Sequence, residues 1–143
     1  MYDIIIKNGK IVDGTGNPWF YGDIGIKDGK ILKVGRLSSA DSERLIDAKN
    51  CIVSPGFIDM HSHSDFAPFI NPYMESKVRQ GVTTEVVGNC GFSAAPLNDF
   101  LKEELLKTSP MLREANVKLD WKSMAEYSTA GRAWNNQSFR FGV

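Results

Sequence analysis

The sequence predicts an α/β protein that starts with a strand-rich segment and continues into a strand–helix–strand–helix unit. Three observations predict this class: a duplicated hairpin pattern near the start, a nearly continuous β-branched run at 82–87, and helix signals on both sides of that run. A Ser-Pro-Gly sequence at 54–56 interrupts the first pattern and marks a boundary. We therefore expect two parts, residues 1–54 and 55–143.

The first part contains an internal repeat. Residues 3–12 recur as 23–32, with seven of ten positions identical at an offset of twenty. Each copy alternates apolar and polar side chains around a two-residue turn that ends in glycine. Such turns favour type I′ hairpins, because both central residues need a positive φ. We therefore expect two hairpins in a small antiparallel sheet, with turns at Asn8-Gly9 and Asp28-Gly29.

A polar stretch follows the hairpins. Residues 36–50 carry few apolar side chains, and a turn is expected at 47–50. The apolar run at 51–53 predicts a short last strand of the first part. Cys51 lies in this run, and we expect it to be a small buried hydrophobe.

The second part alternates between strand and helix patterns. Strands are predicted at 57–60 and 82–87, with a helix at 73–80 between them and another from Asn98 to about Lys107. The 73–80 helix has Asn and Pro at 71–72, which suit the N-cap and first helical position. Two strands connected through a helix in this way must be parallel.

Two histidines follow the first strand of the second part. In a strand, residues i and i+2 point to the same face, so His61 and His63 should project together as ligands that suit zinc. The pair alone is a weak signal, since solvated turn histidines are common. Cys90 follows the next parallel strand and should reach the same edge, where a carboxylate, Asp65 or Asp59, is also expected. Cys90 as a buried filler is the alternative, but its glycine-rich flanks indicate a loop.

The composition excludes several classes of protein. Seventeen basic residues balance seventeen acidic ones, so we expect no nucleic-acid partner and no membrane partner. The first residues lack a charged n-region followed by an apolar h-region, and the two cysteines do not form a disulfide framework. A cytoplasmic location is the resulting expectation.

Two segments carry a resemblance to a known family. Pro-Gly-Phe-Ile-Asp-Met-His-Ser-His at 55–63 resembles the first barrel strand of the amidohydrolase superfamily. Gly-Val-Thr-Thr-Glu-Val-Val-Gly-Asn-Cys-Gly-Phe-Ser at 81–93 is similar to the N-acyl-D-amino-acid deacylases, and the likeness runs from about Tyr2 to about Tyr127. The resemblance implies a small N-terminal β-sandwich segment, then the first βαβ part of an incomplete TIM-type (β/α)8 barrel. A complete barrel needs about 250 residues.

The resemblance also implies a function. It makes His61, His63 and Cys90 zinc ligands of an enzyme that hydrolyses small N-acyl-D-amino acids to a carboxylate and a D-amino acid. The general base is expected outside this chain, and Asp65 is expected either to orient a ligand histidine or to cap a turn. As the N-terminal portion of a longer enzyme, the chain is expected to be inactive alone. It should also be poorly soluble or self-associating, because two barrel strands leave an open edge and uncovered apolar faces.

Two alternatives stay open at this point. A cyclic-amide hydrolase of the dihydroorotase or hydantoinase type would share the histidine pair, although those enzymes bridge their metals with a lysine rather than with a residue like Cys90. A non-catalytic truncated relative would keep the histidines as relics. Residues 128–138 are polar and weakly periodic, and 139–143 read either as the start of a further strand or as an altered end.

Overall fold

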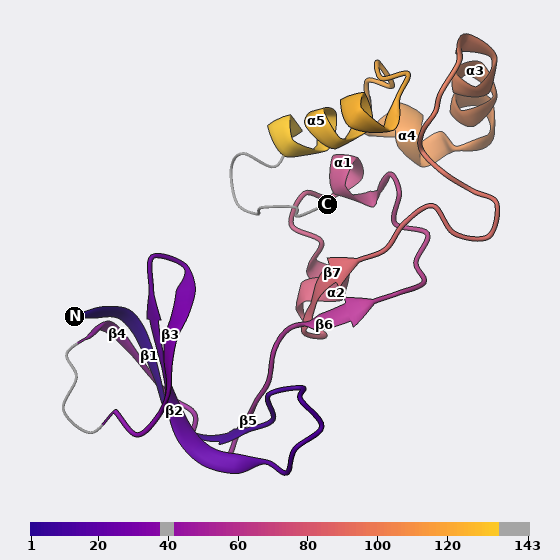
Figure 1. The fold of residues 1–143 in the computed structure, drawn as a ribbon. Coiled ribbons are helices and arrows are strands. Elements are labelled where there is room, and N and C mark those ends of the chain that lie inside the picture. Colours follow the sequence, from indigo (N-terminus) through magenta and orange to yellow (C-terminus); the bar gives the residue numbers. More distant parts are fainter. Residues whose placement is uncertain (38–41, 135–143) are drawn as a thin grey trace. The chain divides into compact units, whose positions relative to one another are not determined.

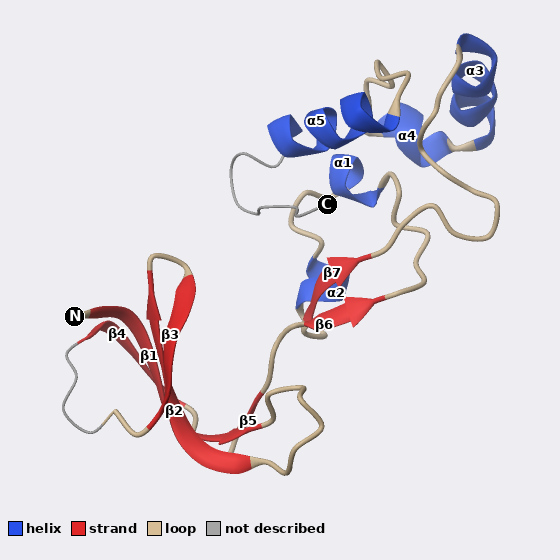
Figure 2. Ribbon diagram, in the orientation of Figure 1, coloured by secondary structure: helices blue, strands red, loops and turns tan. Residues whose placement is uncertain are grey.

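The structure is a computed structural model that describes residues 1–37 and 42–134. Its contacts divide the chain into two units, Met1–Pro55 and Gly56–Val143 (Figure 1). The first unit is built of strands, and the second combines two strands with helices (Figure 2). The predicted α/β class is confirmed. The assignment of residues 1–54 to a sandwich and of residues 55–143 to a barrel stays a prediction.

The described residues of the first unit form one five-stranded sheet in the order β3-β2-β1-β4, with β5 also paired to β1. β1 pairs antiparallel with β2, and β2 with β3, whereas β4 and β5 run parallel to β1. The sheet is therefore mixed. The antiparallel pairing expected for the hairpin region is confirmed in β1, β2 and β3, and the polar segment at 36–50, for which no strand was expected, adds the parallel strand β4. The strands are β1 (Tyr2–Ile11), β2 (Phe20–Lys27), β3 (Lys30–Gly35), β4 (Ser42–Asp47) and β5 (Ile52–Val53).

The two predicted turns have different outcomes. Asp28 and Gly29 join β2 to β3 with φ values of 50° and 71°, so this hairpin is confirmed. The turn predicted at Asn8-Gly9 was wrong, because β1 runs straight through it. Asn8 does have a positive φ of 60°, but the chain uses it for a β-bulge, where the pairing register with β2 shifts.

A buried carboxylate explains why the bulge is stable. Asp23 on β2 accepts hydrogen bonds from the backbone N–H of Asn8 at 2.9 Å and of Leu37 at 2.8 Å. Lys7 Nζ lies 3.8 Å from the same carboxylate. The backbone donor that the bulge removes from the strand ladder is thereby satisfied.

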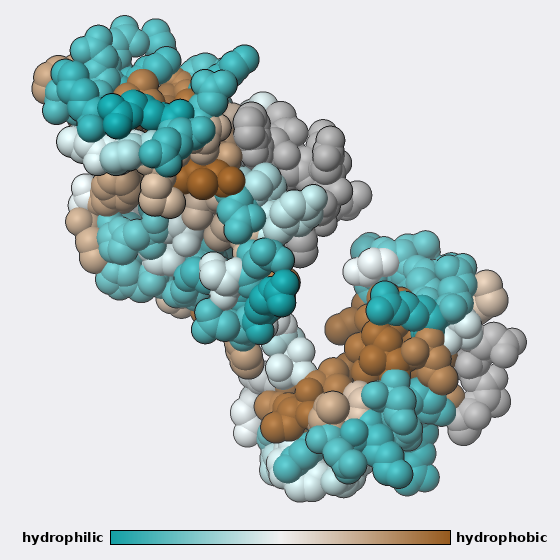
Figure 3. Space-filling view, turned by 180° about the vertical axis from the view of Figure 1, so that it is seen from behind, coloured by the Kyte–Doolittle hydropathy of each residue, from teal (hydrophilic) through white to brown (hydrophobic). Residues whose placement is uncertain are grey.

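The last strand of the first unit is present, but Cys51 beside it is exposed. The prediction that Cys51 is buried was wrong. Its backbone is hydrogen-bonded to Ala48 and Lys10, whereas its side chain faces solvent. Large apolar side chains are also exposed on β3 and β4, and Figure 3 shows hydrophobic residues gathered on this unit. They include Ile31, Leu32, Val34, Leu45 and Ile46.

The second unit opens with two parallel strands, β6 (Phe57–Asp59) and β7 (Val82–Glu85), as predicted. Phe57 and Ile58 are about 60% exposed on β6, so the uncovered apolar surface expected there is present. Gly56 packs closely at the start of the pair, since a Cβ there would overlap the Thr83 side chain. Self-association of the chain stays a prediction.

Five helices follow or separate these strands among the described residues. Asn98 is the N-cap of the helix at 99–108, as predicted, and its side chain accepts a hydrogen bond from the Leu101 N–H at 2.8 Å. The predicted 73–80 helix is shorter, because Met74 is left-handed with φ 45° and Asn71 closes a turn instead. The last helix, at 124–134, includes part of the polar segment 128–138, for which the sequence analysis predicted no element. The helices are α1 (Ala67–Ile70), α2 (Glu75–Val78), α3 (Asp99–Thr108), α4 (Pro110–Glu114) and α5 (Met124–Trp134).

The core of the second unit is aromatic. Trp121 is 2% exposed, stacks on Phe69 of α1 with ring centroids 4.9 Å apart, and meets Tyr127 of α5 edge-on at 5.4 Å. Its indole N–H donates to the Ala94 carbonyl oxygen at 2.8 Å. This core therefore anchors the segment that follows Cys90. It consists of Phe66, Phe69, Ala94, Ala95, Leu97, Leu112, Val117, Leu119 and Trp121.

Across residues 1–37 and 42–134, no helix is both long enough and apolar enough to cross a membrane. The strand that the sequence allowed at 139–143 lies outside the described residues.

Candidate metal centre

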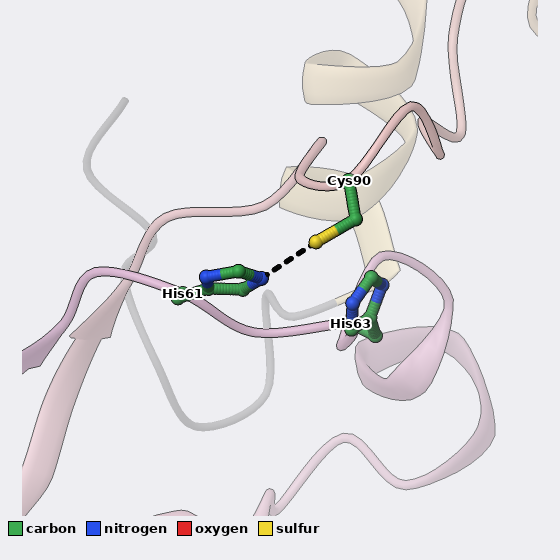
Figure 4. Close-up of side chains that lie close together, drawn as sticks. All are labelled: His61, His63 and Cys90. Atoms are coloured by element: carbon green, nitrogen blue, oxygen red, sulfur yellow. Dashed lines mark hydrogen bonds between the residues drawn. The ribbon is translucent and has the colours of Figure 1, made fainter.

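The three predicted ligands lie together at one end of the β6–β7 pair. His61 and His63 come from the loop after β6, and Cys90 comes from the loop after β7 (Figure 4). One donor atom from each residue lies within 4.8 Å of the other two. His61 Nε2 and Cys90 Sγ lie 2.8 Å apart. All three residues are exposed, so the cluster is open to solvent.

The histidines converge for a different reason from the one predicted. β6 ends at Asp59, so neither His61 nor His63 belongs to the strand. Their rings lie 5.8 Å apart, tilted by 57°. The path of the loop, and not the alternation of a strand, brings them to the same side.

Besides the His61–Cys90 contact, two hydrogen bonds join the loop of the histidines to the loop of the cysteine. Asp65 Oδ1 accepts from the Gly88 backbone N–H at 3.0 Å. The side-chain amide of Asn89 donates to the Ser62 carbonyl oxygen at 3.3 Å. Cys90 itself adopts a left-handed φ of 56°, a conformation that needs support from its surroundings. Both bonds are made by the two residues before Cys90, so they hold the backbone that leads into it.

Asp65 is 1% exposed, and it acts on the backbone of the neighbouring loop. Its second oxygen, Oδ2, has no hydrogen-bond partner among the described residues. The backbone carbonyl of Asp65 accepts from the Tyr127 hydroxyl at 2.6 Å. Burial, and the nearby negative charge of Asp65, raise the pKa of Tyr127 to about 12, so the hydroxyl remains a donor. Asp65 therefore links α5 and both ligand-bearing loops.

Asp59, the other carboxylate expected at the site, is engaged on two sides. Its Oδ1 accepts from the His61 backbone N–H at 3.2 Å, and its Oδ2 pairs with Lys77 at 2.6 Å. The hydrogen bond from Lys77 is the main reason that the pKa of Asp59 is lowered. Asp59 therefore holds the start of the histidine loop as an ionised acceptor.

Sequence reasoning missed three residues around the site. Phe92 borders it, with its ring 6.3 Å from that of His63. Asn89 joins the loops, and Lys77 binds the carboxylates at the strand ends. The position of Asn89 in the Gly-Asn-Cys-Gly sequence was a usable signal. For Lys77, a lysine on a short polar helix, the sequence offers no comparable signal.

The donor set fits a divalent metal ion. Two imidazole nitrogens and one thiolate are ligands that zinc prefers, and three protein ligands leave the open position typical of catalytic zinc. Zinc–ligand bonds of about 2.0–2.3 Å hold neighbouring donors roughly 3.5 Å apart. This value lies between the 2.8 Å His61–Cys90 contact and the 4.8 Å that bounds the cluster.

Comparison with known proteins gives consistent results. Residues 44–130 match the model described as the amidohydrolase family. An N-acyl-D-glutamate deacylase of Alcaligenes xylosoxydans xylosoxydans is 46% identical over 94 residues, which cover 66% of this chain and 19% of that protein. The chain therefore spans about a fifth of the length of this curated relative.

Two solved structures are similar as well. An N-acyl-D-glutamate deacylase from Bordetella bronchiseptica, complexed with zinc and a phosphonate inhibitor, is 46% identical with a TM-score of 0.65, over 66% of this chain and 20% of that one. A D-aminoacylase is 36% identical with a TM-score of 0.77, over 93% of this chain and 27% of that one.

Proposed function

Because the chain belongs to the amidohydrolase family, we propose that it supplies the first metal ligands of a zinc-dependent N-acyl-D-amino-acid deacylase. The substrate would be a small N-acyl-D-amino acid, hydrolysed at its amide bond to a carboxylate and a free D-amino acid. The structural likeness to deacylases, one of them complexed with zinc, supports this choice of metal and reaction. The side chain and acyl group of the substrate are left unspecified.

The observation that carries the proposal is the position of Cys90. A thiol within 2.8 Å of a histidine nitrogen, and within 4.8 Å of a donor atom from a second histidine, forms a soft ligand set. This set favours the deacylase reading over a cyclic-amide hydrolase, for which the family resemblance implies a bridging lysine in place of such a cysteine. It also favours a working site over relic histidines, because Asp65 and Asn89 hold both loops in place.

Some residues of this chain would bind the metal ion, and others would hold the ligand-bearing loops in position. A bound zinc ion supplies Lewis acidity and lowers the pKa of its water toward about 7. His61 and His63 would hold the ion as neutral donors, and Cys90 would add a negative charge that partly offsets that of the metal. Asp65 would keep the cysteine loop in register through Gly88. The exposed face of the cluster would admit the substrate.

The remaining groups of the reaction are expected from a longer protein. The chain has only two histidines, and it spans about a fifth of its curated relative. We therefore expect further ligands and the general base to lie outside these residues, and we expect this chain to be inactive alone.

A chimaera tests the proposal directly. This chain would replace the matching part of the N-acyl-D-glutamate deacylase, to which it is 46% identical over 94 residues. The chimaera is expected to retain zinc and to hydrolyse N-acyl-D-glutamate, but neither the L enantiomer nor a cyclic amide such as a hydantoin. His61→Ala and Cys90→Ser should each abolish measurable turnover.

Cys51→Ser provides the matched control, because Cys51 is the other exposed thiol and lies in the other unit. It should leave both zinc content and turnover unchanged. Full activity of the Cys90→Ser chimaera with normal zinc content would refute the proposed role of this cysteine. Hydantoin opening without deacylation would favour the cyclic-amide reading.

A further inference from the structure

A lysine joins the ends of the two strands that lead to the metal ligands. Lys77, on the short helix α2, places its Nζ 2.6 Å from Asp59 Oδ2 and 2.7 Å from Glu85 Oε1. Asp59 is the last residue of β6 and Glu85 the last of β7, and the two are register partners in the parallel pair. One ammonium group therefore bridges both strand ends.

Each of the two carboxylates also contacts the histidine loop. Asp59 accepts from the backbone N–H of His61 at 3.2 Å. Glu85 accepts from the hydroxyl of Ser64 at 3.0 Å. The strand that carries the cysteine loop is thus tied to the histidine loop through Glu85, and Lys77 holds Glu85 beside Asp59.

Electrostatics makes the ammonium necessary to this arrangement. The Glu85 side chain is only 8% exposed, so water screens its charge poorly. Without Lys77, two neighbouring carboxylates would repel each other, and the buried one would lose its counter-charge. Hydrogen bonds to Asp59 and then to Glu85 raise the pKa of Lys77, which agrees with a charged bridge.

Among the described residues of the second unit, two other ion pairs are of a different kind. Lys107–Glu104 lies within α3, and Arg79–Glu75 joins the C-cap of α2 to its first residue; the side chains of both pairs are largely exposed. Exposed pairs of this type contribute little to stability and connect no loops. They supply controls for the bridge.

We propose that Lys77 is a positioning residue of the metal site, which sets the distance between the histidine loop and Cys90 by bridging Asp59 and Glu85. The inference rests on the proposed metal-binding function and deepens it. Lys77 touches no ligand side chain among the described contacts, so it would act through the backbone of His61 and through Ser64. Its loss should therefore change the geometry and affinity of the metal site more than the stability of the fold.

Cobalt(II) titration of the 143-residue chain tests this role, because a thiolate–cobalt bond gives a charge-transfer absorption band that reports coordination by Cys90. Lys77→Met is expected to weaken cobalt binding about 10- to 100-fold and to alter the band at saturating metal. Lys77→Arg keeps a cation that can engage two carboxylates and should stay within about threefold of wild type. Lys107→Met is the matched control and should leave binding unchanged.

A second variant separates electrostatic positioning from a loss of packing. In Lys77→Met/Glu85→Gln the uncompensated repulsion is removed, so the cobalt affinity should recover in part. If circular dichroism shows that Lys77→Met does not fold, Lys77→Gln replaces it and is judged by the same limits.

Three results would overturn the inference. If folded Lys77→Met binds cobalt with wild-type affinity and an unchanged band, Lys77 has no positioning role, but the proposed metal site is not contradicted. An equal loss in Lys77→Met and Lys77→Arg would show that the charge is not what matters. Absence of cobalt binding by the wild-type chain would instead refute the metal site itself, and the role of Lys77 with it.

Discussion

His61 Nε2 lies 2.8 Å from Cys90 Sγ, although 29 residues separate the two along the chain. Neither residue belongs to a regular element. Parallel pairing of β6 with β7 brings their loops to the same end, and the bond from Gly88 to Asp65 holds them together. The ligand cluster thus depends on the short β6–β7 pair and on the buried carboxylate of Asp65.

This contact predicts that zinc protects one of the two thiols. Cys51 and Cys90 are both exposed, so both should react with a thiol reagent in the metal-free chain. With zinc bound, Cys90 should become unreactive while Cys51 still reacts, since metal coordination occupies the thiolate. Mass spectrometry after labelling measures this at each site. Equal labelling of both thiols with zinc present would contradict the assignment of Cys90 as a ligand.

A second prediction concerns Asp65. Asp65→Ala leaves the Gly88 N–H without its acceptor and removes a buried carboxylate, so zinc affinity should fall about 10- to 100-fold. The free energy of unfolding should fall by about 1–3 kcal/mol, the usual cost of an unsatisfied buried donor. Zinc titration and urea unfolding measure the two effects. Asp65→Asn retains an acceptor for Gly88 and should lose less of both; a larger loss than in Asp65→Ala would contradict this explanation.

The sequence predicted those parts of the structure that depend on local pattern. Asp28-Gly29 formed its hairpin, and the Asp3 carboxylate accepts a hydrogen bond from the Asp28 N–H at 2.6 Å. Asn8-Gly9 has the same local chemistry, and its Asn8 N–H is also bound by a carboxylate, but β4 and β5 pair along β1 on both sides of it, so a bulge replaced the turn. Tertiary pairing of this kind cannot be read from an alternating pattern.

In the candidate site, too, the features set by local sequence pattern were predicted and those set by tertiary contacts were not. His61, His63 and Cys90 were predicted from residue type and from their position after two strands, and the structure brings them together. The contacts of Lys77 with Asp59 and Glu85 depend on the left-handed Met74, which starts α2 late and shortens the predicted helix. No spacing rule in the sequence indicates that conformation.

A third prediction concerns pH and Asp23. Burial alone would raise the pKa of this carboxyl, but hydrogen bonds from the Asn8 and Leu37 N–H groups, with the charge of Lys7, lower it overall. A lowered pKa in the folded state means that ionised Asp23 stabilises the fold above the unfolded-state pKa of about 3.9. This stabilisation is lost as the pH falls through the folded-state pKa.

The Asp23→Asn variant measures this effect. At pH 7 the first unit should unfold about 2 kcal/mol more easily than in wild type, the usual value for hydrogen bonds to a charged group. Urea unfolding should show this difference shrinking as the pH falls below about 4. A difference that stays constant down to pH 2 would mean that the charge of Asp23 does not support the bulge.

The last prediction links the core to the metal site through Trp121. Trp121→Phe keeps an aromatic ring against Phe69 but leaves the Ala94 carbonyl, four residues after Cys90, without its donor. The loss of this bond and of buried volume should cost about 2–4 kcal/mol in urea unfolding of the second unit. Trp19→Phe is the control, because Trp19 is 48% exposed in the first unit, and it should change little. Zinc affinity should fall in Trp121→Phe, because the hydrogen bond from Trp121 to Ala94 holds the segment after Cys90. It should not fall in Trp19→Phe, because Trp19 belongs to the first unit. Equal zinc affinity in folded Trp121→Phe would show that the Asp65–Gly88 bond suffices to position Cys90.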